Sequence, residues 1–135
     1  MALDIQKIKP IVKKLAQKYG LFLVILFGSQ ATGKIHKKSD VDIAFYSDKK
    51  MSLYDIAKTQ IEFEQALKVG KIELVDLRNA PPLLLKEIAK NSALLYERDV
   101  FAFSRFKIYA FKRYMESKKL LALRAAALDR FIKKT

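Results

Sequence analysis

The chain has 135 residues, about half of them apolar, which fits one globular domain with its own core. It contains no cysteine, so disulfide frameworks, thiolate zinc sites and cysteine nucleophiles are excluded. The net charge of +13 favours a polyanionic partner such as nucleic acid, nucleotide phosphates or an acidic protein; the alternative is that surface lysines only provide solubility.

The N-terminal segment, MALDIQKIKP, lacks the apolar core of a signal peptide. The longest apolar run, residues 21–27, is too short to span a bilayer. We therefore expect a cytoplasmic protein with no membrane segment, folded as a single domain over residues 1–135.

Apolar periodicity predicts alternating helices and strands along the chain. Pro10 lies inside the first helical pattern and is expected to kink that helix or to mark its start. In chain order the predicted elements are a helix over 4–19, strands over 21–27 and 41–46, a helix over 52–68, a strand over 72–77, a helix over 82–91, a short strand over 93–96 and a long helix over 99–132. This order predicts an α/β or α+β domain with a small mixed sheet flanked by helices.

The last predicted helix, residues 99–132, has Asp99 as a plausible N-cap. It holds more apolar residues than one narrow stripe can contain. Either this segment bends back on the core or it offers an apolar face to another chain, which makes it a candidate partner-docking surface.

Residues 28–42, GSQATGKIHKKSDVD, contain two acidic side chains one residue apart in a basic stretch. On a strand, Asp40 and Asp42 project from the same face, roughly 6.5–7 Å apart, while Val41 and Ile43 pack inward. Such a pair repels itself, and a divalent cation that prefers oxygen ligands, such as Mg²⁺, removes the repulsion. A solvated strand edge is the alternative for an isolated Asp-x-Asp.

A Gly-Ser turn follows the first predicted strand. Gly28 allows close approach of a ligand to the backbone, and backbone N–H groups with the Ser29 hydroxyl can hold phosphate oxygens. If the strands over 21–27 and 41–46 are neighbours, the turn and the two carboxylates face one cleft. That combination favours metal-assisted phosphoryl chemistry.

The same stretch resembles the GSx10DxD signature of the nucleotidyltransferase superfamily related to DNA polymerase β. The whole chain is similar to the minimal nucleotidyltransferase (MNT) group, most strongly over residues 21–47 and 71–98. The resemblance implies a nucleotidyltransferase fold in which Gly28 and Ser29 bind nucleotide phosphates and Asp40 and Asp42 bind metal. The chain departs from the family at Thr32, where an arginine is common, which bears on nucleotide affinity.

The family also implies a third carboxylate on a later strand, acting as a base or as a ligand of a second metal. In the segment KIELVDL we assign this role to Asp76, with Glu73 as the second candidate. Strict alternation places these two residues on opposite faces of a strand, so only one of them can point into the cleft.

The resemblance implies an enzyme that uses Mg²⁺, with two ions expected, and transfers AMP from ATP to a hydroxyl group. Proteins of the MNT group commonly pair with a helical HEPN protein, an RNase toxin, and in some cases adenylylate one of its tyrosines as antitoxins. The alternatives are an antitoxin that only binds the HEPN protein, or a nucleotidyltransferase that acts on RNA or on a small molecule. Binding to nucleic acid is the less favoured reading of the charge.

Overall fold

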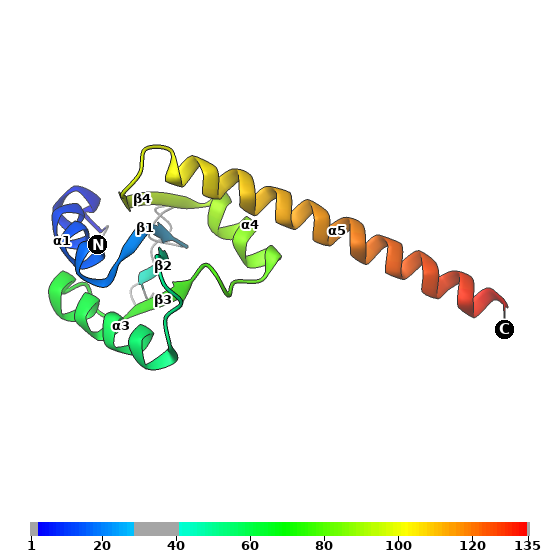
Figure 1. Ribbon diagram of the computed structural model, residues 1–135, viewed down its shortest axis with the longest axis horizontal. Coiled ribbons are helices and arrows are strands. Elements are labelled where there is room, and N and C mark those ends of the chain that lie inside the picture. The colour runs from blue at the N-terminus through cyan, green and yellow to red at the C-terminus, as the bar shows by residue number, and fades with distance from the viewer. Residues whose placement is uncertain (1–2, 29–40, 135) are drawn as a thin grey trace.

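A four-stranded mixed sheet lies between two layers of helices in the computed structural model, which describes residues 3–28 and 41–134 (Figure 1). The elements are α1 (Ile5–Tyr19), β1 (Leu21–Phe27), β2 (Val41–Ser47), α3 (Leu53–Leu67), β3 (Ile72–Asp76), α4 (Pro82–Lys90), β4 (Ser92–Glu97) and α5 (Ala102–Lys134). Each corresponds to a predicted element, and the predicted fold class is confirmed.

The strands lie side by side in the order β3-β2-β1-β4. β1 is antiparallel to β2 and to β4, and β2 is parallel to β3. β1 therefore ends at the same edge of the sheet at which β2 and β3 begin. The sequence-based condition that the first two strands be neighbours is met.

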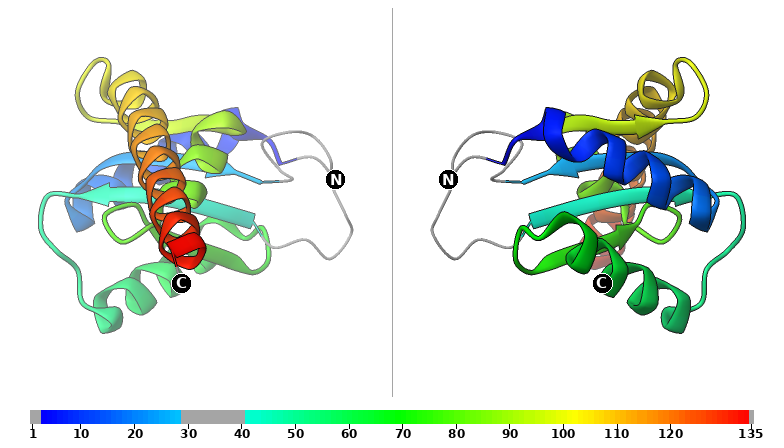
Figure 2. Two further views of the ribbon diagram at one scale, coloured as in Figure 1. Left: turned by 90° about the vertical axis from the view of Figure 1, so that its right-hand side faces the viewer. Right: turned by 90° about the vertical axis from the view of Figure 1, so that its left-hand side faces the viewer.

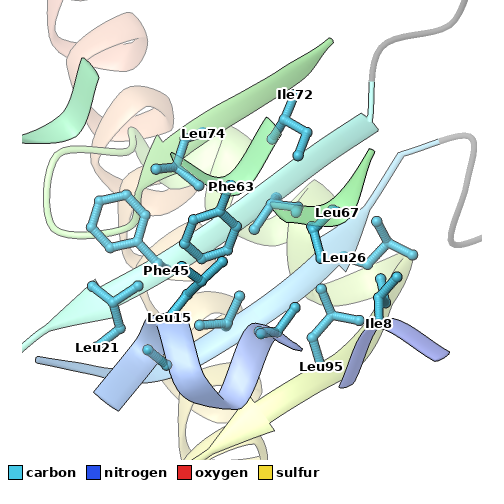
Figure 3. Close-up of a cluster of buried hydrophobic side chains, with 14 of the residues drawn as sticks. Ile8, Leu15, Leu21, Leu26, Phe45, Phe63, Leu67, Ile72, Leu74 and Leu95 are labelled. Atoms are coloured by element: carbon cyan, nitrogen blue, oxygen red, sulfur yellow. The ribbon is translucent and has the colours of Figure 1, made fainter. Parts of the chain in front are cut away.

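α1 and α3 cover one face of the sheet (Figure 2). The core on this face includes Val12 of α1, Phe63 of α3 and Phe45 of β2, all of them fully buried. Figure 3 shows the two phenylalanines within this cluster. Val41 and Ile43 of β2 belong to the same cluster. The face therefore takes the odd-numbered residues of β2, as strand alternation requires.

α4 and the first turns of α5 cover the other face. The core here joins Ala44 of β2, Leu77, Ile88 of α4, and Phe106 and Ala110 of α5. Since Ala44 lies on this face, alternation places Asp42 and Tyr46 on it as well. The face of Asp42 is therefore the one shared with α4 and α5.

Two helix starts differ from the sequence-based expectation. α1 begins at Ile5, where the Asp4 side chain accepts a hydrogen bond from the Lys7 amide, so Pro10 does not mark its start. α5 begins at Ala102, three residues after Asp99, and the side-chain acceptor at its start is Glu97, whose carboxylate accepts from the Phe103 amide at 2.9 Å. The side chain that accepts a hydrogen bond at the start of α5 is therefore that of Glu97 and not that of the predicted cap, Asp99.

α5 is a single helix of 33 residues that does not bend back on the core. Its first turns lie on the sheet and against α4, and its C-terminal half projects from the body of the protein (Figure 1). None of the helices in the described ranges is both long and apolar enough to cross a membrane.

Candidate active site

The structure describes four of the residues considered for the site: Gly28, Asp42, Glu73 and Asp76. The predicted phosphate ligand Ser29, the predicted metal ligand Asp40 and the family departure Thr32 lie outside the described residues. The described part of the site is formed by the end of β1 and the beginnings of β2 and β3.

Gly28 packs directly against the carboxylate of Asp42. A Cβ atom on Gly28 would lie 2.5 Å from Asp42 Oδ2, which no side chain could accept without a shift. Gly28 also has a φ of 78°, in the left-handed region that favours glycine. Two independent observations therefore favour glycine here, and the first of them places Gly28 against the carboxylate of Asp42.

The strand pairing explains this contact. Phe27, the last residue of β1, is the register partner of Asp42. The pairing of β1 with β2 thus brings Gly28, the first residue of the predicted phosphate-binding turn, and Asp42 together at one edge of the sheet. Asp42 is half-buried between Val41 and Ile43, which anchor β2 in the opposite core.

Glu73 is the register partner of Asp42 on the other side. In the parallel pair of β2 and β3, Asp42 lies level with Glu73, and partners in register project from the same face. Adjacent strands are about 4.8 Å apart, so the two carboxylates stem from neighbouring positions. Glu73 is exposed, while its neighbours Ile72 and Leu74 are buried on the α1–α3 side.

Asp76 lies elsewhere. It is the register partner of Phe45, three residues further along the sheet from Asp42, which corresponds to about 10 Å. Strand alternation turns it to the face opposite Glu73. Its carboxylate is buried and already engaged: Oδ1 accepts from the Arg78 amide at 3.0 Å and Oδ2 from Asn79 Nδ2 at 3.3 Å.

Asp76 thus stabilises the turn that leads out of β3. The sequence-based preference for Asp76 over Glu73 is not supported by this geometry, which favours Glu73. The sequence shows that the two carboxylates face opposite ways but does not show how β3 aligns with β2, so the preference for Asp76 stays a prediction that the strand register does not favour.

The donor atoms at this edge suit a hard divalent cation. Asp42 and Glu73 offer carboxylate oxygens, the ligands that Mg²⁺ prefers, and a cation between them would offset the repulsion of two like charges. Over residues 3–28 and 41–134 no three acidic, histidine or cysteine side chains are grouped for a metal. A third acidic ligand would be Asp40, which is outside those ranges.

Polar groups at the far ends of β2 and β3 are held in a different way. The Arg78 guanidinium donates to the Ser47 carbonyl at 2.6 Å from Nη2 and 3.2 Å from Nε. Arg98 Nη1 donates to Asp48 Oδ2 at 2.7 Å, and this hydrogen bond lowers the pKa of Asp48 below its usual value. These groups fix loops at the edge that lies away from Asp42.

A hollow of about 450 Å³ lies near those far ends, between the sheet and α5. Tyr46 lines it, stacked on Phe22 with ring centroids 5.4 Å apart and edge-on to Phe106 at 6.0 Å. Burial, with a smaller contribution from Tyr109, raises the pKa of Tyr46 to about 12. Tyr46 is four residues along β2 from Asp42, about 13 Å, so this hollow is separate from the carboxylate site.

Comparison with known proteins places the chain in a family. The family model described as "Polymerase beta, Nucleotidyltransferase" matches residues 6–101, which include all four strands of the sheet. The protein adenylyltransferase MntA of Aphanizomenon flos-aquae (strain 2012/KM1/D3) is 28% identical over 123 residues, which cover 84% of this chain and 82% of that protein.

Two solved structures share the fold. A crystal structure of a toxin–antitoxin with AMP-PNP is 25% identical with a TM-score of 0.70, and the match covers 92% of this chain and 98% of that one. A structure of the tri-AMPylated Shewanella oneidensis HEPN toxin in complex with an MNT antitoxin gives a TM-score of 0.70 at 23% identity, covering 96% and 99%. With the family model spanning the sheet, Gly28, Asp42 and Glu73, the chain belongs to the polymerase β nucleotidyltransferase family.

Proposed function

We propose that this chain transfers AMP from ATP to a hydroxyl group, that the acceptor is a tyrosine of a HEPN toxin, and that the protein acts in the cytoplasm as the antitoxin. The observation that carries the proposal is the contact of Gly28 with Asp42, with Glu73 in register beside it. The name of the MntA relative and the contents of the two toxin–antitoxin structures support the choice of nucleotide and acceptor.

In this proposal residues 1–135 form one minimal nucleotidyltransferase domain, whose site residues bind metal, hold phosphate or accept the proton. Asp40, Asp42 and Glu73 would hold two Mg²⁺ ions, because carboxylates provide the oxygen ligands that this ion prefers. Bound Mg²⁺ would neutralise the phosphate charge that builds up as AMP is transferred. Gly28 and Ser29 would hold the phosphates through the backbone of the turn and the serine hydroxyl.

The transfer of AMP exchanges one bond to the α-phosphorus for another. The acceptor oxygen forms a bond to the α-phosphorus, the bond between that phosphorus and the bridging oxygen breaks, and pyrophosphate leaves. Glu73 takes the proton of the hydroxyl group, because it is the exposed member of the carboxylate pair and faces an acceptor that arrives from solution. Asp76 takes no part, since its carboxylate is buried in the turn that follows β3.

The test is a labelling experiment with α-³²P-ATP, Mg²⁺ and the product of the neighbouring gene, which the proposal expects to be a HEPN protein. Wild type is compared with Asp42→Asn and Glu73→Gln, and with Asp76→Asn as the matched carboxylate control. We expect label on the HEPN protein with wild type and Asp76→Asn, and almost none with the other two variants.

Three results would contradict the proposal. If the two proteins co-purify but no label appears with wild type, the chain is an antitoxin that acts by binding alone. If the label appears on RNA or a small molecule in place of the HEPN protein, the acceptor is wrong. Equal labelling by wild type and Asp42→Asn would remove the carboxylate site from the reaction.

A further inference from the structure

α5 passes from a buried to an exposed environment along its length. Ala102, Phe106 and Ala110 are buried against the sheet and α4. Residues 118–134 are all exposed, although they include six large apolar side chains with 49% to 67% of their surface accessible: Leu120, Leu121, Leu123, Leu128, Phe131 and Ile132. A projecting helix of this length is only marginally stable alone in water, so burial of this surface would stabilise it substantially.

Several of these side chains continue the buried line of the first half. Ala110, Tyr114, Ser117 and Leu121 follow at spacings of four, three and four residues, and Leu128 comes seven residues later. Such spacing keeps side chains on one side of a helix and is typical of a surface that packs against another helix. We call Tyr114, Leu121, Leu128 and Ile132 the distal stripe.

A hollow lies where the distal stripe begins. It has a volume of about 280 Å³ and lies between the first residue of α4, Pro82, and the side chains of Arg113, Ser117 and Leu120 on α5, with Glu116 completing the lining. The stripe therefore starts from a concave site, which would receive a side chain of whatever packs along the helix. From there the helix projects from the body of the protein (Figure 1).

Charge distinguishes the possible occupants. Residues 112–134 carry eight lysine or arginine side chains and two acidic ones. Two copies of this helix packed side by side would place like charges against each other, which costs free energy. An occupant with carboxylates around an apolar helix face would satisfy both the stripe and its basic surroundings.

We propose that the distal stripe docks against a helix of the HEPN toxin, on a surface that is apolar at its centre and acidic at its rim. This inference rests on the proposed function, because that function supplies the toxin as a partner. The docked toxin contacts a part of the chain separate from the carboxylate edge, so toxin binding can be disrupted while nucleotide binding is kept.

The experiment uses the full chain and the HEPN toxin that the proposed function assigns to it as partner. The stripe variant is Leu121→Glu with Leu128→Glu. The control variant is Ala122→Glu with Ala126→Glu, which adds the same charge to the same exposed helix away from the stripe. Isothermal titration measures the affinity of each variant for the toxin and, separately, for AMP-PNP. Circular dichroism confirms that the helix content is unchanged.

We expect the stripe variant to lose at least about 30-fold in toxin affinity, as truncation of central interface residues does, and to bind AMP-PNP as wild type does. The control variant should match wild type in both affinities. If the stripe variant binds the toxin normally while Asp42→Asn still abolishes labelling, the docking inference is wrong and the proposed function stands. If wild type neither binds nor labels the toxin, the proposed function fails and the docking inference falls with it.

Two further results would replace the occupant. If a second copy of the chain covers the stripe, sedimentation of the chain alone would show a dimer for wild type and a monomer for the stripe variant. Loss of binding to a fluorescent single-stranded RNA in the stripe variant, with toxin affinity unchanged, would identify a polynucleotide surface. Either result would overturn the proposal.

Discussion

β3 carries two carboxylates whose environments differ in every respect. Glu73, near its start, is exposed and level with Asp42, whereas Asp76, at its end, is buried and accepts hydrogen bonds from the chain that follows. The register of β3 with β2 places the carboxylate of Glu73 beside that of Asp42, and two like charges repel each other. The carboxylate of Asp76 instead accepts hydrogen bonds from the Arg78 amide and the Asn79 side chain. We expect this difference to separate a carboxylate placed for a ligand from one placed for the fold.

The sharpest way to test this contrast is Glu73→Gln. We expect AMP transfer to fall by about 10² to 10⁴, because the amide removes a proton acceptor and a charged ligand while keeping the shape of the side chain. The melting temperature should stay within experimental error of wild type, since Glu73 is exposed. Single-turnover rates and thermal melts measure the two quantities. Normal transfer rates in Glu73→Gln would favour Asp76 as the third carboxylate of the site.

The second test concerns the turn that faces Asp42. Gly28→Ala should lower both activity and stability, with a cost in stability of about 1–3 kcal/mol for a left-handed residue that now has a Cβ. Gly70→Ala is the matched control, because Gly70 also has a positive φ, of 94°, but a Cβ there meets nothing within 4 Å.

Both glycine variants should therefore lose stability through strain, while only Gly28→Ala should lose transfer activity and nucleotide affinity. Denaturant titration gives the free energy of unfolding, and AMP-PNP titration reports on the site. An equal loss of activity in the two variants would mean that general destabilisation, not the contact with Asp42, is responsible.

A third prediction concerns Asp76 itself. Asp76→Ala leaves the Arg78 amide and the Asn79 side chain without their acceptor and should cost about 1–3 kcal/mol of unfolding free energy. The transfer rate per folded molecule at a temperature well below the melting point should be close to that of wild type. A loss of activity as large as that of Glu73→Gln, in protein shown to be folded, would contradict the separation of the two carboxylates.

The smallest effect is expected at the ion pair of Asp48 with Arg98. Both side chains are about half exposed, so solvent and salt screen their interaction. Because the pKa of Asp48 is lower in the folded state than in the unfolded state, its contribution is present above the unfolded pKa of about 4 and is lost as the pH falls through the folded value.

Asp48→Asn should therefore lower the melting temperature slightly at pH 7, and the difference from wild type should shrink as the pH falls below about 4. High salt at pH 7 should reduce the same difference. Thermal melts at several pH values measure it, and a difference that grows at acid pH would assign the stabilisation to another group.

Most of the fold could be predicted because the apolar runs are unambiguous. LFLVILF ends at a Gly-Ser pair, and β1 spans the same seven residues, since a strand buried on both faces has no polar position to blur its limits. The extent of α5 could also be predicted, but not where it leaves the body. Helical periodicity continues unchanged from the buried Phe106 to the exposed Ile132, and only tertiary packing separates the two halves.

The site could be predicted as far as local sequence determines it. Gly28 and Asp42 were identified together because a hairpin between adjacent strands makes their proximity a local matter. The choice between Glu73 and Asp76 depends on how a parallel strand aligns with its neighbour after a helical crossover, which no local pattern states. Glu97 was missed as the acceptor at the start of α5 because it is the last residue of β4. Loop residues separate it from the helix, whereas an N-cap is expected directly before the first helical turn.

The short connection from α3 to β3 has a consequence for how this protein can evolve. It contains Lys68 and Gly70, with φ values of 54° and 94°, and delivers β3 so that Glu73 faces the same way as Asp42. A gain or loss of one residue there that shifted the strand would present Leu74 or Ile72 to Asp42 instead and turn the glutamate to the other face. Insertions that most surface loops tolerate would be selected against at this turn, and its length should be as constrained among functional relatives as the acidic residue that it positions.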